Sequence, residues 1–137
     1  MNSITQRAAL VILLASFANF PAIGAQTAKT PAADVFRARC FGCHSFACNR
    51  SGPKLEGVLG RKAASLSDFG GYTEALKESG LTWTEETLNR FLEDPGKLVP
   101  GTLMTAARKV ENAKERQMLI QFIKRPDTSM DLCSGGR

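Results

Sequence analysis

Hydrophobic positions recur at helical spacing in several short segments of the chain, and strand-like alternation is weak throughout. The pattern predicts helices over residues 32–39, 72–79, 84–93 and 112–124. Thr84 precedes two glutamates and suits an N-cap, while Gly80, Pro95 and Pro126 each follow a predicted helix and mark its end. The sequence therefore predicts an all-α domain of four to five short helices.

The apolar run near the N-terminus is of a different kind. Residues 8–18 are almost wholly apolar, one arginine and no acid precede them, and Pro21 and the small residue Ala25 follow. Eleven apolar residues form about 16 Å of helix, against roughly 30 Å for the hydrocarbon core of a bilayer. We interpret residues 1–25 as a signal peptide cleaved after Ala25, with an uncleaved anchor as the alternative. Residues 26–31 would then form a flexible N-terminus, and the mature form would have no membrane span.

Composition narrows the classes of function. The 137 residues are 43% hydrophobic and 23% charged, which suits one soluble globular domain. The net charge of +5 is modest and spread along the chain, so we expect no nucleic-acid binding. The single histidine, His44, excludes a metal site that needs two imidazoles from one chain.

The most specific motif is Cys40-Phe41-Gly42-Cys43-His44, which has the Cys-x-x-Cys-His spacing typical of c-type haem attachment. Two thiols at this spacing can each add to a vinyl group of one porphyrin, and the imidazole that follows can reach its iron. Three other interpretations remain: a thioredoxin-type redox pair, a zinc site completed by Cys48, and an ordinary disulfide beside a surface histidine. Because an export signal precedes the motif, we favour covalent haem.

A low-spin haem that cycles electrons needs a second axial ligand, and no second histidine exists. Among the four methionines, Met1 leaves with the signal peptide, Met118 sits in a predicted helix where core packing is expected, and Met130 lies in a polar tail. Met104 remains, in a loop that a Pro-Gly pair bends into a turn. We therefore expect His44 and Met104 to hold the iron.

With these residues placed, the chain resembles the class I cytochromes c, in the branch of mitochondrial cytochrome c and bacterial cytochrome c2. The resemblance runs from about Ala32 to Lys124. It rests on an ordered set of motifs: Cys40-x-x-Cys43-His44, Gly52-Pro53-x-Leu55, Gly60-Arg61-Lys62, Phe69, Tyr72, Gly80-Leu81-Thr82-Trp83, Phe91-Leu92-x-x-Pro95 and Pro100-Gly101-Thr102-x-Met104. The resemblance implies a class I cytochrome c fold around one covalently bound haem c, with the domain over residues 32–125 and a C-terminal tail over residues 126–137.

The resemblance also implies roles for residues around the cofactor. The carbonyl of Pro53 would accept the proton of the second ring nitrogen of His44, which orients the ring and increases its basicity. Four side chains would wall off or hydrogen-bond the anionic propionates: Arg61, Tyr72, Trp83 and Thr102. The simpler alternatives are packing for the two aromatic residues and a solvated surface charge for the arginine.

Four positions depart from the family's pattern. Phe91 replaces a tyrosine whose hydroxyl reaches the axial sulfur, and Leu76 replaces an asparagine of the same buried network. Ala106 stands in place of an aromatic that shields the haem edge, and Ala32 in place of a glycine that lets helices approach closely. We expect fewer hydrogen bonds around the sulfur of Met104, which would change the reduction potential and the alkaline stability of its bond to iron.

Two cysteines are left after haem attachment. The segment between His44 and Pro53 is shorter than in mitochondrial members and contains Cys48, while Cys133 lies near the C-terminus. In an oxidising compartment we expect these two to form a disulfide that pins the tail over the haem-motif side. Two free thiols or an intermolecular link are the alternatives.

These observations predict an exported, periplasmic, monohaem electron carrier that is a monomer and not an enzyme. Redox proteins would donate and accept single electrons at the exposed haem edge. Lys97, Arg108 and Lys109 are candidate docking charges near Met104, although Leu103 stands where relatives often have a lysine. The alternatives are a haem enzyme or a peroxide or gas sensor with a labile sixth ligand, and a zinc-structured interaction module.

Overall fold

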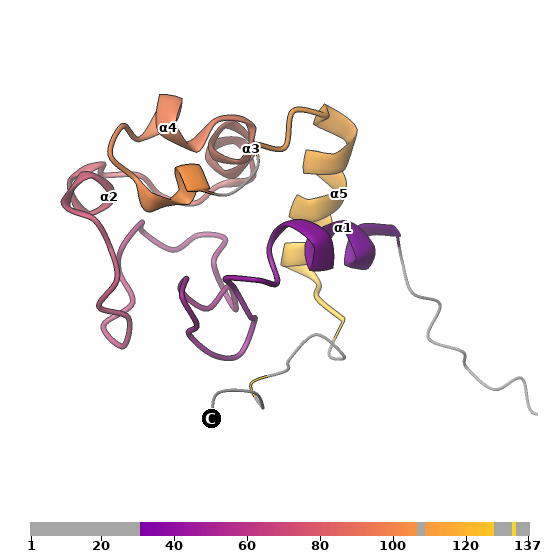
Figure 1. Ribbon diagram of the computed structural model, residues 1–137, viewed down its shortest axis with the longest axis horizontal. Helices are drawn as coiled ribbons and strands as arrows, with labels where there is room; N and C mark the ends of the chain where they lie inside the picture. The colour runs from indigo at the N-terminus through magenta and orange to yellow at the C-terminus, as the bar shows by residue number, and fades with distance from the viewer. Residues whose placement is uncertain (1–30, 107–108, 128–132, 134–137) are drawn as a thin grey trace, which may run out of the picture.

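The computed structural model describes residues 31–106, 109–127 and 133 of the chain. Within them lie five α-helices and one 3-10 helix (Figure 1): α1 (Pro31–Arg39), α2 (Glu74–Glu78), α3 (Glu85–Glu93), α4 (Pro95–Leu98), η1 (Leu103–Ala106) and α5 (Ala113–Lys124). An isolated antiparallel bridge between Lys62 and Thr82 is the only β pairing among these residues. The all-α prediction is confirmed.

Side-chain caps set the ends of the helices. The hydroxyl of Thr84 accepts the amide of Thr87 at 3.1 Å, and the Thr87 hydroxyl accepts the amide of Thr84 at 2.8 Å, so α3 begins with a reciprocal capping box. The side-chain oxygen of Asn112 accepts the amides of Lys114 and Glu115 and caps α5, which places Asn112 just before the helix rather than in it. The predicted helix over residues 72–79 is shorter in the structure, because Thr73 is its N-cap.

Two details of the loop region differ from the prediction. Pro95 ends α3 as expected but also opens α4, because the carboxylate of Asp94 accepts the amide of Lys97 at 3.1 Å and caps a new turn. Met104 lies in the 3-10 turn η1 rather than in an open loop. In Figure 1 this turn lies below α3 and above the segment that follows α1.

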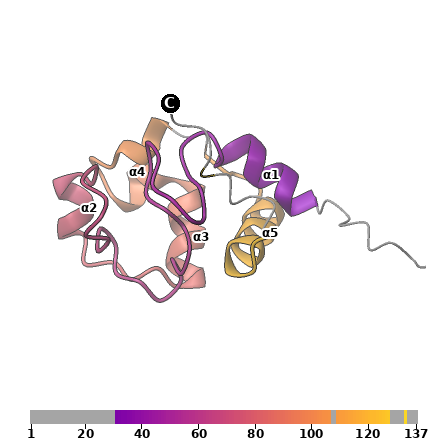
Figure 2. The same ribbon diagram turned by 90° about the horizontal axis from the view of Figure 1, so that it is seen from below.

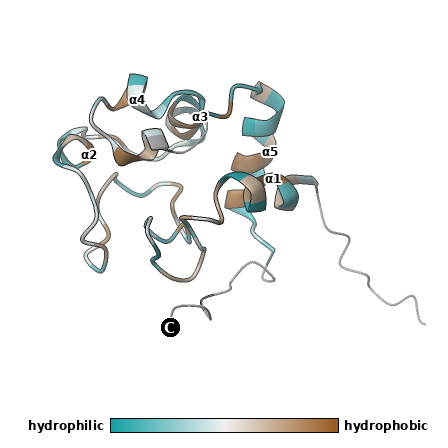
Figure 3. Ribbon diagram, in the orientation of Figure 1, coloured by the Kyte–Doolittle hydropathy of each residue, from teal (hydrophilic) through white to brown (hydrophobic). Residues whose placement is uncertain are grey.

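The core forms where α1 and α5 cross (Figure 2). Phe36 on α1 and Leu119 on α5 have no exposed surface, and the rings of Phe36 and Phe122 lie 5.4 Å apart. Phe46 completes an aromatic trio, with ring centroids 4.8 Å from Phe36 and 5.8 Å from Phe122. Figure 3 shows the hydrophobic colour in the turns of α5 nearest α1. His44 precedes Phe46 by only two residues in the sequence. The aromatic trio therefore links the crossing of α1 and α5 to the segment that carries His44.

Helix α3 packs between α5 and α4, and its buried side chains extend the hydrophobic core away from the crossing of α1 and α5. Its Phe91 lies 4.9 Å from the ring of Trp83, and both side chains are buried. No helix among the described residues is long and apolar enough to cross a membrane. The proposed signal peptide and the segment 26–31 lie outside the described residues, except for Pro31, which is the first residue of α1.

Candidate haem site

His44 is held in place by the turn that ends α1. The amide of His44 donates to the carbonyl of Cys40 at 2.9 Å, and the amide of Cys40 donates to Phe36 at 2.8 Å, so the chain continues as a turn beyond the helix. The imidazole is buried, with 8% of the residue exposed, and its Nδ1 lies 2.7 Å from the carbonyl oxygen of Pro53. A carbonyl can only accept, so Nδ1 carries the proton and Nε2 keeps a free lone pair for a metal ion.

The protonation state of His44 also suits a ligand. Burial of the imidazole lowers its pKa below the usual value, and the hydrogen bond to Pro53 offsets part of that shift. The ring is therefore neutral near neutral pH, which is the form that binds iron. The Pro53 contact expected from the family resemblance is present in the structure.

Gly52 gives the His44 ring the space that it occupies. A Cβ atom at Gly52 would lie 2.5 Å from Cε1, 2.8 Å from Nδ1 and 2.9 Å from Nε2 of the imidazole. These separations are all shorter than van der Waals contact, so the ring lies directly against the backbone. The amide of Gly52 in turn donates to the carbonyl of Cys43 at 2.8 Å. The glycine is needed here for close approach, and sequence reasoning had assigned it no role of its own.

A Gly52→Ala substitution tests this close approach. We expect the added methyl group to displace the His44 ring from Pro53 and to lower the free energy of unfolding of the holoprotein by about 1–3 kcal/mol. Gly70→Ala is the matched control, because nothing lies within 4 Å of a Cβ at Gly70. Denaturant titrations of the two variants measure the difference. Equal midpoints for the two variants would show that the ring has room to move.

The two motif cysteines are unpaired. Cys40 is buried and Cys43 is exposed, and neither forms a disulfide. Burial raises the pKa of the Cys40 thiol to about 12, against a smaller lowering effect of Arg39. Because Cys40 and Cys43 form no disulfide, both sulfur atoms can attach to a porphyrin, and the interpretation of this pair as an ordinary disulfide does not fit the structure.

The other two alternatives for the motif also lack support. Cys48, which a zinc site would need, is joined to Cys133 in a disulfide. Within the described residues no group of three or more His, Cys, Asp or Glu side chains is arranged to hold a metal ion. A thioredoxin-type pair would sit in a strand–helix–strand unit, and the described part of the chain has no strand around it. The donor set that remains is two thiols, one oriented imidazole and a thioether, which matches the needs of haem c.

The disulfide between Cys48 and Cys133 lies close to the histidine. Its Cα atoms are 5.8 Å apart, and it joins positions 85 residues apart in the sequence. Ser45, the residue after His44, has no exposed surface, and its Oγ lies 3.5 Å from the sulfur of Cys48 and 3.9 Å from that of Cys133. The disulfide therefore packs against the segment that holds the imidazole.

Met104 packs against the buried core from the η1 turn. Its amide donates to the hydroxyl of Thr102 at 3.3 Å, and the buried Thr102 donates its own amide to Val99 at 3.1 Å. Gly101, with φ of 94°, provides the left-handed turn that leads into this segment. Thr102 therefore fixes the backbone of the methionine, a contact that the sequence did not predict.

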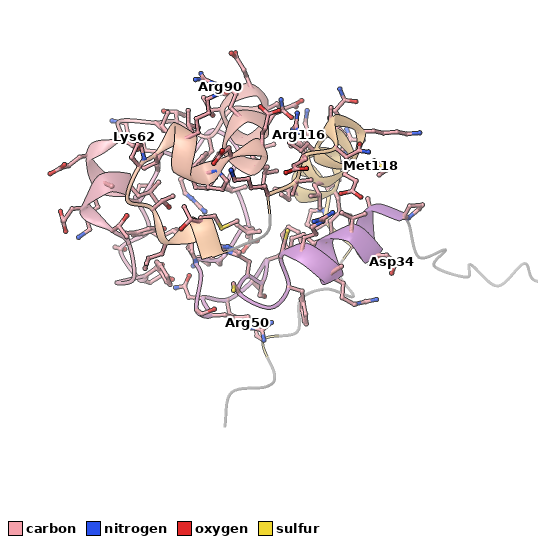
Figure 4. All side chains as sticks on the ribbon, turned by 45° about the horizontal axis from the view of Figure 1, so that its top comes forward. Asp34, Arg50, Lys62, Arg90, Arg116 and Met118 are labelled. Carbon is pink, nitrogen blue, oxygen red and sulfur yellow. A yellow bond between two sulfur atoms is a disulfide. The ribbon has the colours of Figure 1, made fainter. Side chains whose placement is uncertain are left out.

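The other candidate methionines are placed differently. Met118 was expected in the core, but it is half-buried and lines a surface groove on α5 together with Ala32 and Phe122. Figure 4 shows it on the outer side of that helix. The core packing predicted for Met118 is thus wrong, because Leu119, Ile120, Phe122 and Ile123 fill the inner face of α5. Met130 lies outside the described residues.

Three of the four residues expected near the propionates, Arg61, Tyr72 and Trp83, lie close to one another. Arg61 is half-buried and donates to the carbonyls of Glu56 at 2.8 Å and Lys54 at 2.9 Å, so it is more than a solvated surface charge. Tyr72 is half-buried, and burial raises the pKa of its phenol while the charge of Arg61 lowers it. The backbone joins this region to Trp83, whose amide donates to Arg61 at 2.9 Å.

The surface around the η1 turn is less basic than the sequence suggested. Lys109 forms an ion pair with Asp94 at 2.6 Å, which raises the pKa of the lysine and compensates its charge. Lys97 is exposed, and Arg108 lies outside the described residues. Leu103 is 71% exposed and is the only large hydrophobic side chain so exposed in the described part of the chain. The residue next to Met104 therefore presents apolar surface to the solvent.

Comparisons with known proteins agree with this geometry. The chain is 39% identical to cytochrome c of Arabidopsis thaliana over 95 residues, covering 67% of this chain and 83% of the relative. It is 38% identical to cytochrome c2 of Blastochloris viridis over 118 residues, covering 84% of this chain and 87% of the relative. Among solved structures, cytochrome cH from Methylobacterium extorquens superposes with a TM-score of 0.64 at 39% identity, covering 68% of this chain and 93% of that one. No protein-family model matches the sequence.

The chain belongs to the cytochrome c family, and its fold is that of the class I members. It carries one covalently bound haem c and functions in electron transfer rather than as an enzyme. The unpaired motif cysteines, the oriented imidazole and the half-buried thioether fit this group.

Proposed function

We propose that this protein is an exported, periplasmic carrier of single electrons, with haem attached through Cys40 and Cys43 and iron held by His44 and Met104. The observation that carries the proposal is the His44 imidazole, which is buried, neutral and fixed by Pro53 with Nε2 left free. The bound haem supplies an iron that alternates between the ferric and ferrous states. The donor and the acceptor are respiratory or periplasmic redox proteins.

The chain contributes a rigid environment that changes little when the charge of the iron changes. The Pro53 carbonyl holds the ring of His44 in one orientation, and the Gly52 backbone lies against it. On the other ligand, Thr102 holds the amide of Met104, and a thioether favours the ferrous state. Fixed ligands lower the reorganisation that accompanies each electron transfer, which suits a carrier.

We assign four further residues to the propionates: Arg61, Tyr72, Trp83 and Thr102. The proximity of Arg61 to Tyr72 and the backbone bond from Trp83 to Arg61 support a common site for three of them. Arg61 uses two of its five N–H donors on backbone carbonyls, which fixes its guanidinium and leaves donors for an anionic group. Partners dock at the exposed haem edge, next to Leu103.

A potentiometric titration of the purified protein tests the carrier function. We expect one reversible, one-electron transition. In a separate measurement, the absorption spectrum should not change when carbon monoxide or cyanide is added at low concentration. A haem enzyme or a gas sensor would instead bind these ligands readily at an open sixth position. Such binding would contradict the proposal.

Export rests on the N-terminal sequence and has its own test. When the full chain is expressed in a bacterium with c-haem maturation, we expect the haem protein in the periplasmic fraction with an N-terminus at Gln26. A protein retained in the membrane fraction with an intact N-terminus would indicate the anchor instead. The mature form is expected to elute as a monomer.

The environment of the axial sulfur gives a second prediction. Phe91 is buried beside Trp83 and has no hydroxyl to offer Met104. Restoring the family's hydroxyl with Phe91→Tyr should change the reduction potential and raise the pH at which the Met104–iron bond is lost. Both are measured by spectroscopic titration, with Phe91→Leu as the control that adds no hydroxyl. Unchanged values in Phe91→Tyr would show that the missing hydroxyl is irrelevant.

A further inference from the structure

Arg116 is the buried charge that the site described above does not use. Only 5% of the residue is exposed, although arginine is seldom buried without partners. It lies on α5 at the place where this helix faces α3, and Figure 4 labels it there. Its partners show what it does.

On one side, Arg116 is fixed by α3. Its Nε donates to the side-chain oxygen of Asn89 at 2.8 Å, and its Nη2 lies 3.1 Å from a carboxylate oxygen of Glu93. These two contacts hold the planar guanidinium in one orientation.

On the other side, Arg116 holds the end of the segment that carries Met104. Its Nη1 donates to the carbonyl of Val110 and to that of Glu111, each at 2.8 Å. Val110 is buried, and its amide donates to Leu92 at 2.9 Å. Val110 follows Met104 by six residues in the sequence, so Arg116 holds the chain close to the methionine.

We propose that Arg116 is a positioning residue for the axial ligand: by holding the carbonyls of Val110 and Glu111 against α3, it fixes the chain shortly after Met104 and thereby favours the bond from Met104 to iron. If the chain at Val110 and Glu111 moves when Met104 leaves the iron, the buried guanidinium loses two of its acceptors. The two hydrogen bonds from Arg116 therefore favour the state in which Met104 is bound to the iron. This inference rests on the proposed function, since it takes Met104 as the ligand.

Imidazole binding to the ferric holoprotein measures the opening directly. Imidazole binds iron only when Met104 has left, so its apparent dissociation constant falls as the open fraction rises. For Arg116→Gln we expect the dissociation constant to fall at least tenfold at fixed pH and ionic strength. Arg116→Lys keeps the charge but not the planar set of donors, and we expect an intermediate value. Asn89→Ala removes one acceptor that orients the guanidinium and should lower the constant about threefold, which preserves the test if Arg116→Gln does not fold.

Two controls separate positioning from general stability. Lys124→Gln breaks the ion pair from Lys124 to Glu85 at 2.6 Å, which also joins α5 to α3 but does not touch the Met104 segment. Ile123→Val loosens the core of α5. For the two controls, we expect any change in imidazole affinity to scale with the loss of unfolding free energy. If the imidazole affinity of Arg116→Gln also lies on that scale, its effect is one of general stability and the positioning role is wrong.

The outcome also distinguishes this inference from the proposed function. Wild-type protein that shows the far-red ferric band of sulfur ligation, together with an unchanged imidazole constant in Arg116→Gln, overturns the positioning role alone. Wild-type protein that binds imidazole as tightly as Met104→Ala overturns the assignment of Met104 as the ligand, and the inference with it.

Discussion

Replacing Met104 with alanine is expected to abolish the far-red ferric band, convert the iron to a high-spin or water-ligated form, and lower the reduction potential by on the order of 0.1 V or more. The physical reason is that the thioether is a soft ligand that stabilises ferrous iron. Met104 is half-buried against the core in η1, and the described residues include only one other methionine, Met118 on the outer side of α5. Among the described residues, the core therefore offers no second thioether.

Met118→Ala is the matched control for this prediction. Its side chain lines a surface groove, so the far-red band and the potential should stay as in the wild type. Spectra and potentiometric titrations of both variants make the comparison. A far-red band that survives in Met104→Ala and disappears in Met118→Ala would reverse the ligand assignment.

The Cys48–Cys133 disulfide should provide the largest single contribution to stability. It closes a sequence separation of 85 residues, and the chain-entropy model gives roughly 4–5 kcal/mol for a loop of this length. Strain in the native state would subtract from this upper figure. We therefore expect the double variant Cys48→Ser, Cys133→Ser to lose about 3–5 kcal/mol of unfolding free energy, measured by denaturant titration.

The location of the disulfide adds a spectroscopic expectation. Because both sulfur atoms lie close to the buried Ser45 beside His44, loss of the disulfide should also raise the pH at which acid breaks the bond from His44 to iron, seen as loss of the low-spin bands. Ala47→Ser, an exposed change in the same segment, is the control and should alter neither property. A free-thiol count of two on denatured, unreduced wild-type holoprotein would show that the disulfide does not form.

Local signals in the sequence were sufficient for much of the site. Some features depend only on neighbours within a few residues, so the sequence pattern predicts them directly. These are the Cys-x-x-Cys-His spacing, the Thr84 cap and the apolar faces of the first and last helices. The structure brings these apolar faces together, with the rings of Phe36 and Phe122 in contact where α1 and α5 cross. The assignment of Met104 depends on elimination, which is possible because the chain has one histidine and few methionines, and it stays a prediction.

Contacts between residues that are distant in the sequence could not be predicted from the pattern of hydrophobic and polar positions. An arginine among charged neighbours predicts a solvated side chain, yet Arg116 is buried by Asn89 and Glu93, which belong to another helix. The sequence assigns Gly52 no role of its own, and only the position of the His44 ring shows why a side chain is excluded. Lys109 counted as a free docking charge because its partner, Asp94, is distant in sequence.

The absorption spectrum of the purified holoprotein, oxidised and reduced, tests the central claim most directly. The claim is that His44 and Met104 together hold the iron of one haem attached at Cys40 and Cys43. It predicts sharp low-spin bands on reduction and the weak far-red band of sulfur ligation in the ferric state. A high-spin spectrum that shifts when carbon monoxide or cyanide is added would contradict the claim.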